Sequence, residues 1–132
     1  MAKILIVDDE ESDRLLAQAI LARAGHETVF AEDGEEALQR YREGGIEVVV
    51  TDLHMPQVHG FEVISLLRED DDPPALVAIS GTGQFQLQMA EALGARHTLS
   101  KPLNPKLLLD AVERALAERE EARQERATGG GE

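Results

Sequence analysis

Residues 46–52 read IEVVVTD, a short apolar run with three consecutive valines that ends in an aspartate. β-Branched residues favour strands. A run without polar alternation is typical of a strand that is covered on both faces, as in parallel sheets. The stretch therefore predicts a strand over Ile46–Thr51 within a parallel sheet, with Asp52 directly after it.

Outward from this run, short apolar segments alternate with segments of helical periodicity. Four further strands are predicted at Lys3–Val7, Thr28–Ala31, Ala75–Ser80 and Arg96–Ser100. Helices are predicted at Ser12–Ala24, Gly34–Glu43, Gly60–Arg68, Gln84–Leu93 and, with Asn104 as its N-cap, Pro105–Arg126. Such regular alternation in 132 residues predicts one open, doubly wound α/β sheet with helices on both faces, because a closed eight-stranded barrel needs about twice the length.

The composition narrows the classes of ligand. The formal net charge is −13, with 26 acidic and 13 basic residues, which argues against direct binding of nucleic acid or an anionic membrane. It favours divalent cations or basic protein surfaces. The chain has no cysteine, no apolar run near the roughly 18 residues of a membrane span, and no signal-peptide pattern at MAKILIVDDE. We therefore expect a cytoplasmic protein.

Polar residues stand at the carboxyl ends of four predicted strands: Asp8-Asp9, Asp52, Ser80 and Lys101. Ligands of open parallel sheets bind at this edge. Taken singly, each residue has an ordinary explanation as a helix cap, turn residue or surface charge. Together they indicate a site, because three carboxylates at one edge repel each other unless a cation neutralises them. Hard oxygen ligands favour Mg²⁺, with Mn²⁺ as an alternative.

Once a metal offsets the charge, one of these carboxylates can attack a phosphoryl group. Phosphoryl transfer then needs little beyond positioning and charge neutralisation. The Lys101 ammonium and the Ser80 hydroxyl would supply further contacts to the phosphoryl oxygens. We therefore predict that one of these carboxylates accepts a phosphoryl group in a Mg²⁺-dependent reaction.

Four segments give the chain a recognisable pattern: ILIVDDE at 4–10, VVVTDLHMPQVHGFEVI at 48–64, AISG at 78–81 and GARHTLSKPL at 94–103. With them the chain resembles, over about residues 3–118, the receiver domains of two-component response regulators. The resemblance implies a flavodoxin-like five-stranded parallel sheet in the order 2-1-3-4-5 with five helices. It also implies a signalling domain that catalyses only its own phosphorylation and slow dephosphorylation, and is otherwise no enzyme.

The resemblance assigns roles around the metal. Asp52 is similar to the phosphoacceptor, Asp9 to the direct metal ligand and Asp8 to the carboxylate that acts largely through water. His54 stands where the family uses a backbone carbonyl as a third metal ligand, so its imidazole need not bind.

The resemblance also assigns switch and tuning positions. Ser80 is similar to the switch hydroxyl and Lys101 to the phosphate-contacting lysine, whose bond to Pro102 is cis in the family. Thr82, like His54, stands where the family tunes access of the hydrolytic water. Thr98 replaces the aromatic switch residue that the family often has, which puts the usual readout through that strand in doubt.

The resemblance implies protein partners: a sensor histidine kinase or a histidine phosphotransfer protein as donor, and an unspecified downstream protein. A homodimer through the face of residues 84–93, 96–100 and 105–126 is a further expectation.

Three other functions stay open. In the first, which follows from Thr98 replacing the aromatic residue, the domain is an atypical receiver that serves as a docking module and whose phosphorylation matters little. A Mg²⁺ phosphohydrolase with an aspartate nucleophile uses similar parts, but typically has a D-x-D pair where this chain has Asp8, Asp9 and Glu10. A flavin- or nucleotide-binding domain would need a first loop that attracts phosphate, and DDEESD at 8–13 repels it.

The C-terminal part differs in composition from the rest. Glu118–Arg126 is mostly charged and has no apolar stripe, so we expect it to project into solvent. The predicted division is a receiver domain at 1–119 and, at 120–132, a charged helical extension with a flexible glycine-rich tail from Thr128. The DDDPP run at 70–74 is predicted to be a solvated turn.

Overall fold

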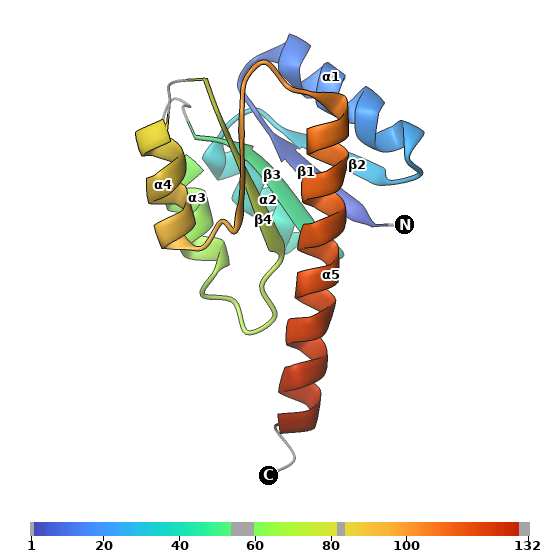
Figure 1. Cartoon of the computed structure of the whole chain (residues 1–132), viewed down its shortest axis with the longest axis vertical. Helices are drawn as coiled ribbons and strands as arrows, with labels where there is room; N and C mark the ends of the chain where they lie inside the picture. Colours follow the sequence, from blue (N-terminus) through green and yellow to red (C-terminus); the bar gives the residue numbers. More distant parts are fainter. Residues whose placement is uncertain (1, 54–59, 82–83, 130–132) are drawn as a thin grey trace.

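The computed structural model describes residues 2–53, 60–81 and 84–129. In this part of the chain strands and helices alternate from the N-terminus to a long C-terminal helix (Figure 1). The strands are β1 (Lys3–Val7), β2 (Glu27–Ala31), β3 (Val48–Asp52), β4 (Ala75–Ser80) and β5 (His97–Ser100). The helices are α1 (Glu11–Arg23), α2 (Gly34–Arg42), α3 (Gly60–Leu67), α4 (Gln84–Leu93) and α5 (Pro105–Gly129).

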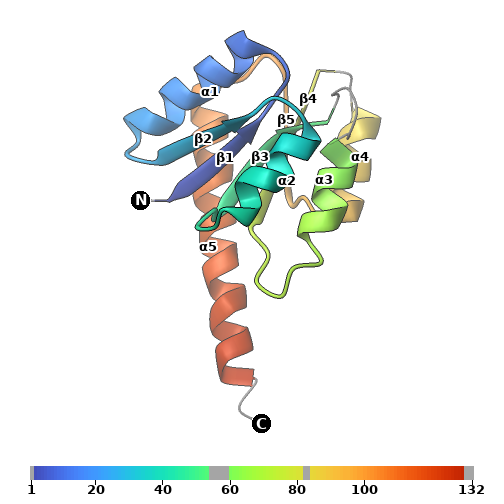
Figure 2. The same cartoon turned by 180° about the vertical axis from the view of Figure 1, so that it is seen from behind.

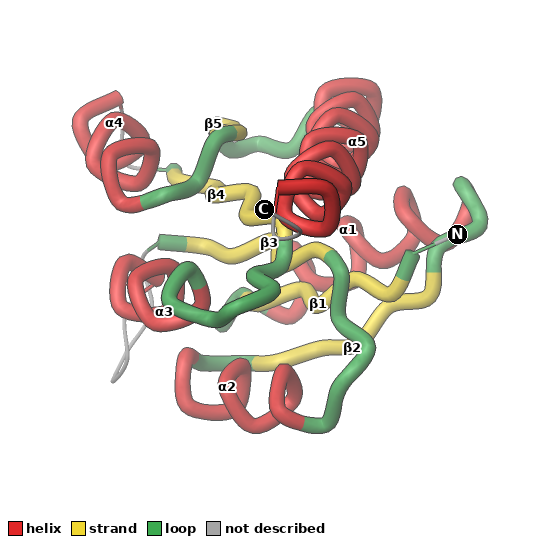
Figure 3. The backbone as a smooth tube through the Cα atoms, turned by 90° about the horizontal axis from the view of Figure 1, so that it is seen from below, coloured by secondary structure: helices red, strands yellow, loops and turns green. Residues whose placement is uncertain are grey.

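Within the described residues, the strands form one parallel five-stranded sheet in the order β2-β1-β3-β4-β5. Helices α2, α3 and α4 cover one face and α1 and α5 the other, as Figure 3 shows from below. This confirms the predicted doubly wound fold and its strand order. None of the helices in the described ranges combines the length and apolar character that crossing a membrane would take.

Strand alternation divides the core between the two faces. On β1, Leu5 and Val7 pack in the cluster under α2–α4, whereas Ile4 and Ile6 pack under α1 and α5. This is the period of two expected of a strand with both faces covered. The apolar runs of the sequence therefore form a sheet that is buried on both sides.

The main correction to the predicted boundaries concerns β3. The strand was predicted at Ile46–Thr51, but it spans Val48–Asp52, where Asp52 is in register with Ile79 of β4. Asp52 is thus the last residue of the strand itself and its backbone is held in the sheet. The N-cap prediction for the last helix is confirmed, since the Asn104 side chain accepts a hydrogen bond from the Leu107 amide at 3.1 Å.

The C-terminal part of α5 is less free than its composition indicated. The helix passes beyond the sheet, as Figures 1 and 2 agree, and continues through Gly129, so the predicted tail is helical at Thr128. Its arginines nevertheless reach back to the DDDPP run. Asp72 accepts a 2.8 Å hydrogen bond from Arg126 and lies 3.4 Å from Arg123 and 3.5 Å from Arg119.

Arg119 joins this cluster to the sheet. Its Nε donates to the Pro73 carbonyl at 3.2 Å, and its guanidinium lies 3.8 Å from Glu47, just before β3. Arginines at positions i, i+4 and i+7 share one helix face, which explains how a single carboxylate meets all three. The turn at 70–74 therefore anchors α5 instead of being only solvated.

We expect Asp72→Ala to loosen the end of α5 without unfolding the domain. The Arg123 and Arg126 side chains are about half exposed, so each pair adds little to global stability, but together they restrain the last turns. Amide hydrogen exchange over residues 120–129 should become severalfold faster while that of β1 stays unchanged. Asp71→Ala, which removes the neighbouring charge, is the control. Equal exchange in both variants and the wild type would contradict the anchor.

A second contact of the 70–74 turn involves the single tyrosine. The Tyr41 hydroxyl on α2 donates a 2.8 Å hydrogen bond to Asp70. Burial raises the pKa of Tyr41 from 10.0 to about 12, and the hydrogen bond and negative charge of Asp70 act in the same direction. The folded protein therefore keeps the phenol proton longer than the unfolded chain, so this stabilisation is present below pH 10 and is lost between pH 10 and 12.

Alkaline titration should reveal this contact, because the chain has one tyrosine and no tryptophan. Phenolate absorbance should rise with a midpoint near pH 12, and Asp70→Asn should move the midpoint towards 10.0. Circular dichroism at each pH reports whether the fold persists. A midpoint near 10.0 in the folded wild type would contradict the hydrogen bond.

Candidate functional site

The carboxyl edge of the sheet gathers the polar residues that follow the strands. Asp8 comes directly after β1, Asp52 ends β3 and Ser80 ends β4. These three are buried, with 4%, 4% and 1% of their surface exposed, within a core that is mostly apolar. Lys101 follows β5, and its amide donates to the Ser80 carbonyl at 3.0 Å, which extends the sheet pairing by one step.

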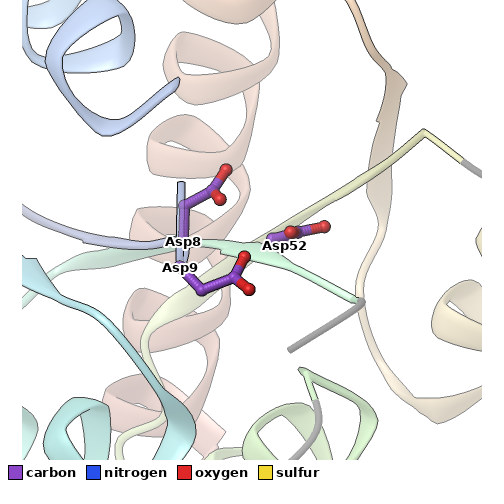
Figure 4. Close-up of side chains that lie close together, drawn as sticks. All are labelled: Asp8, Asp9 and Asp52. Atoms are coloured by element: carbon purple, nitrogen blue, oxygen red, sulfur yellow. The ribbon is translucent and has the colours of Figure 1, made fainter. Parts of the chain in front are cut away.

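Three carboxylates of this edge lie close enough to share one cation. Asp8, Asp9 and Asp52 each offer an oxygen within 4.8 Å of the others (Figure 4). Asp9 is exposed, whereas the other two are buried. An all-oxygen set that opens to solvent on one side suits Mg²⁺, which retains several waters and takes one or two carboxylates directly.

The two members of the acidic pair differ in their surroundings. One Asp8 oxygen accepts a hydrogen bond from the Glu10 amide at 2.9 Å, and the other lies 3.0 Å from the Lys101 ammonium. Both oxygens of Asp8 are thus already engaged. Asp9 forms no ion pair with any residue of the described ranges, so its carboxylate is the more available of the two for a metal ion.

Among the described residues, Lys101 is the cation that pairs with the carboxylates of this edge. Its ammonium lies 2.9 Å from Asp13, 3.0 Å from Asp8 and 3.4 Å from Asp52. Burial alone would lower the pKa of Lys101, but hydrogen bonds to Asp13 and Asp8 and the charge of Asp52 outweigh it and raise the pKa above its ordinary value. The lysine therefore stays charged and offsets part of the carboxylate repulsion.

Sequence reasoning missed Asp13. The residue lies in the first turn of α1, where an acidic side chain is expected for its favourable interaction with the helix dipole. The available signal was its place in the DDEESD run, five residues after Asp8, on a helix that starts at the site. Neither feature indicates a contact with a lysine 88 residues away.

The predicted switch and tuning positions are only partly within the described residues. His54 and Thr82 lie outside the described residues. The Lys101–Pro102 bond is cis, as the resemblance implied. Thr98 is in register with Ala78, a residue of the core cluster under α2–α4, so it faces that side of the sheet.

His97 faces the opposite side, where its Nε2 lies 2.8 Å from Glu118 of α5. The neighbouring Arg96 approaches the same carboxylate at 4.0 Å. Side chains that precede Thr98 thus tie the start of β5 to α5, while Thr98 itself faces α4.

The fold and this edge together define a flavodoxin-like α/β protein with an acidic cluster and a lysine at the ends of its strands. The family model for the response regulator receiver domain matches residues 4–113. The chain therefore belongs to the response regulator receiver domain family, as the sequence motifs predicted.

Individual relatives agree with this membership. The chain is 31% identical to the chemotaxis protein CheY of Thermotoga maritima, over 83% of this chain and 93% of that protein. It is 36% identical to the alkaline phosphatase synthesis transcriptional regulatory protein PhoP of Bacillus subtilis, over 79% of this chain and 44% of PhoP. The chain thus spans less than half the length of that relative.

Solved structures are similar in fold. The chemotaxis response regulator CheY4 of Vibrio cholerae superposes with a TM-score of 0.80 at 34% identity, covering 88% of this chain and 99% of that one. A receiver domain protein from Clostridium thermocellum gives a TM-score of 0.84 at 28% identity, covering 91% and 98%.

The charge balance of the site generates a stability prediction. Asp9→Asn removes a carboxylate that repels Asp8 and Asp52 and has no cation partner in the described ranges, so in EDTA the Tm should rise by a few degrees. Lys101→Met removes the neutralising charge and should lower the Tm. Thermal unfolding at increasing NaCl tests whether charge repulsion is the cause, because screening by salt should reduce the rise in Tm that Asp9→Asn produces. A lower Tm for Asp9→Asn would contradict repulsion at this edge.

Proposed function

We propose that Asp52 accepts a phosphoryl group from a phosphohistidine of a sensor histidine kinase or a histidine phosphotransfer protein. The observation that carries the proposal is the position of Asp52, a buried carboxylate fixed at the end of β3, between two other carboxylates and the Lys101 ammonium. Family membership supports the class of reaction.

The chain's own residues can perform the transfer with few parts. A carboxylate oxygen of Asp52 attacks the phosphorus in line, an oxygen–phosphorus bond forms, and the nitrogen–phosphorus bond breaks with its electron pair moving to the departing imidazole. Asp52 needs no general base, because it reacts as a carboxylate. Lys101 and the Ser80 hydroxyl donate hydrogen bonds to the phosphoryl oxygens.

A divalent cation would be held by Asp9 and Asp52 directly and by Asp8 through water, with the backbone carbonyl of His54 as a further ligand. The engagement of both Asp8 oxygens by Glu10 and Lys101 favours this division. When bound, Mg²⁺, or Mn²⁺ in its place, supplies the charge neutralisation that lets an anionic donor approach this acidic edge.

The phosphorylated domain would signal through contact with another protein in the cytoplasm. We infer that movement of Ser80 towards the phosphoryl group shifts a two-state surface around α4 and β5, with a downstream protein or a second copy of the chain at the α4–β5–α5 face as its reader. Neither nucleic acid nor a membrane is a direct ligand of this strongly acidic domain.

A second candidate function rests on Thr98. A small polar side chain cannot swing inward as an aromatic ring does, which favours a docking module with weak phosphorylation-dependent switching. Partner binding with and without a phosphoryl mimic separates the two functions: equal affinity indicates docking, and a clear difference indicates a switch.

Labelling by a small phosphodonor tests the main proposal. With acetyl phosphate and Mg²⁺, the wild type should take up one acid-stable, base-labile phosphoryl group, and Asp52→Asn and EDTA should each abolish it. Asp71→Asn, at the far end of the sheet, is the matched control and should label normally. Undiminished labelling of Asp52→Asn would reject the assignment, and steady turnover of p-nitrophenyl phosphate would instead favour the phosphohydrolase.

A further inference from the structure

The shortest contact of the Lys101 ammonium is with a residue of α1 and not with a residue at a strand end. Asp13, in the first turn of α1, lies 2.9 Å from the ammonium, closer than Asp52 at 3.4 Å. Asp13 is not one of the three carboxylates that approach each other closely enough to share a cation. Its contact is therefore with the lysine, not with the acidic cluster.

A lysine ammonium has three hydrogens to donate. In the described residues, Asp8, Asp13 and Asp52 surround it within hydrogen-bonding or ion-pair distance. A phosphoryl group at Asp52 brings further anionic oxygens to the same ammonium. To donate to one of them, Lys101 must weaken one of its present contacts.

Of the three contacts of the ammonium, the one with Asp13 costs the least free energy to break. Its side chain is 32% exposed, whereas those of Asp8 and Asp52 are 6% and 5% exposed. Water can solvate the Asp13 carboxylate after the ammonium leaves, but a buried carboxylate without its cation would be strongly destabilised. Asp8 is also fixed by the amide of Glu10.

We propose that Asp13 is a positioning residue that holds the Lys101 ammonium on the α1 side of the site and competes with the incoming phosphodonor for it. The contact is exchanged: the ammonium leaves Asp13 when phosphoryl oxygens arrive beside Asp52. This inference rests on the proposed phosphoacceptor function.

Acetyl phosphate labelling at fixed Mg²⁺, followed across donor concentrations, tests the competition. Asp13→Asn keeps the shape of the side chain and removes its charge. The half-saturating donor concentration should fall about threefold, the effect of one partly exposed ion pair. The maximal rate should change by less than about twofold, because Asp52 and the donor chemistry are unaltered. A purely structural role of Asp13 would not lower the half-saturating concentration while leaving the maximal rate nearly unchanged.

Three control variants assign the effect to the Lys101 contact. Asp13→Glu retains the charge and should restore the wild-type half-saturation. Glu10→Gln removes a charge from the same acidic run that forms no ion pair with the lysine, and should leave the half-saturation unchanged. In a Lys101→Met background, Asp13→Asn should not lower the half-saturating donor concentration. If the Lys101→Met protein does not fold, the other two variants decide.

The outcomes separate this inference from the proposed function. A wild type that is not labelled at Asp52 rejects the phosphoacceptor function and the Asp13 role together. Normal wild-type labelling with an unchanged half-saturation in Asp13→Asn rejects the Asp13 role alone. An equal fall in Glu10→Gln also rejects it, because general charge repulsion would then account for the effect.

Discussion

The fold places carboxylates where an apolar sheet ends, and their mutual repulsion is the constraint that the site must meet. β1 and β3 are neighbours in the sheet, so the residues at their carboxyl ends lie side by side. Asp8 and Asp52 are buried there with the ammonium of Lys101 between them. Without a cation this arrangement would be costly, and one lysine offsets only part of the charge of four nearby carboxylates. The remaining negative charge supports the proposed divalent-ion site at this edge.

The sequence predicts local and strand-end features well, for physical reasons. The apolar runs of β1 and β3 define buried strands, and the rule that parallel strands end at one edge then brings Asp8, Asp52 and Ser80 together without any knowledge of side-chain geometry. The Asn104 cap is similarly local, because it depends on residues three positions apart.

Features that depend on tertiary distance could not be predicted in this way. The Lys101–Asp13 contact joins residues 88 apart, and the Arg126–Asp72 contact joins residues 54 apart. Composition indicated a solvated extension because Glu118–Arg126 has no apolar stripe, but ionic contacts can anchor a helix as well as apolar ones. A charged face is therefore evidence of exposure only when no opposite charge lies within its reach.

The Asp13 contact also bears on the proposed response to phosphorylation. Thr98 offers no ring to move, and the start of β5 is tied to α5 through His97 and Glu118. The Lys101–Asp13 pair links the acidic edge to α1 instead, and the turn that carries Asp13 leads directly to the exposed Leu15 and Leu16. If the ammonium leaves Asp13 for phosphoryl oxygens, α1 loses an ionic restraint next to an apolar surface. A route through α1 needs no aromatic switch, so the replacement at Thr98 is compatible with a domain that still responds to phosphorylation.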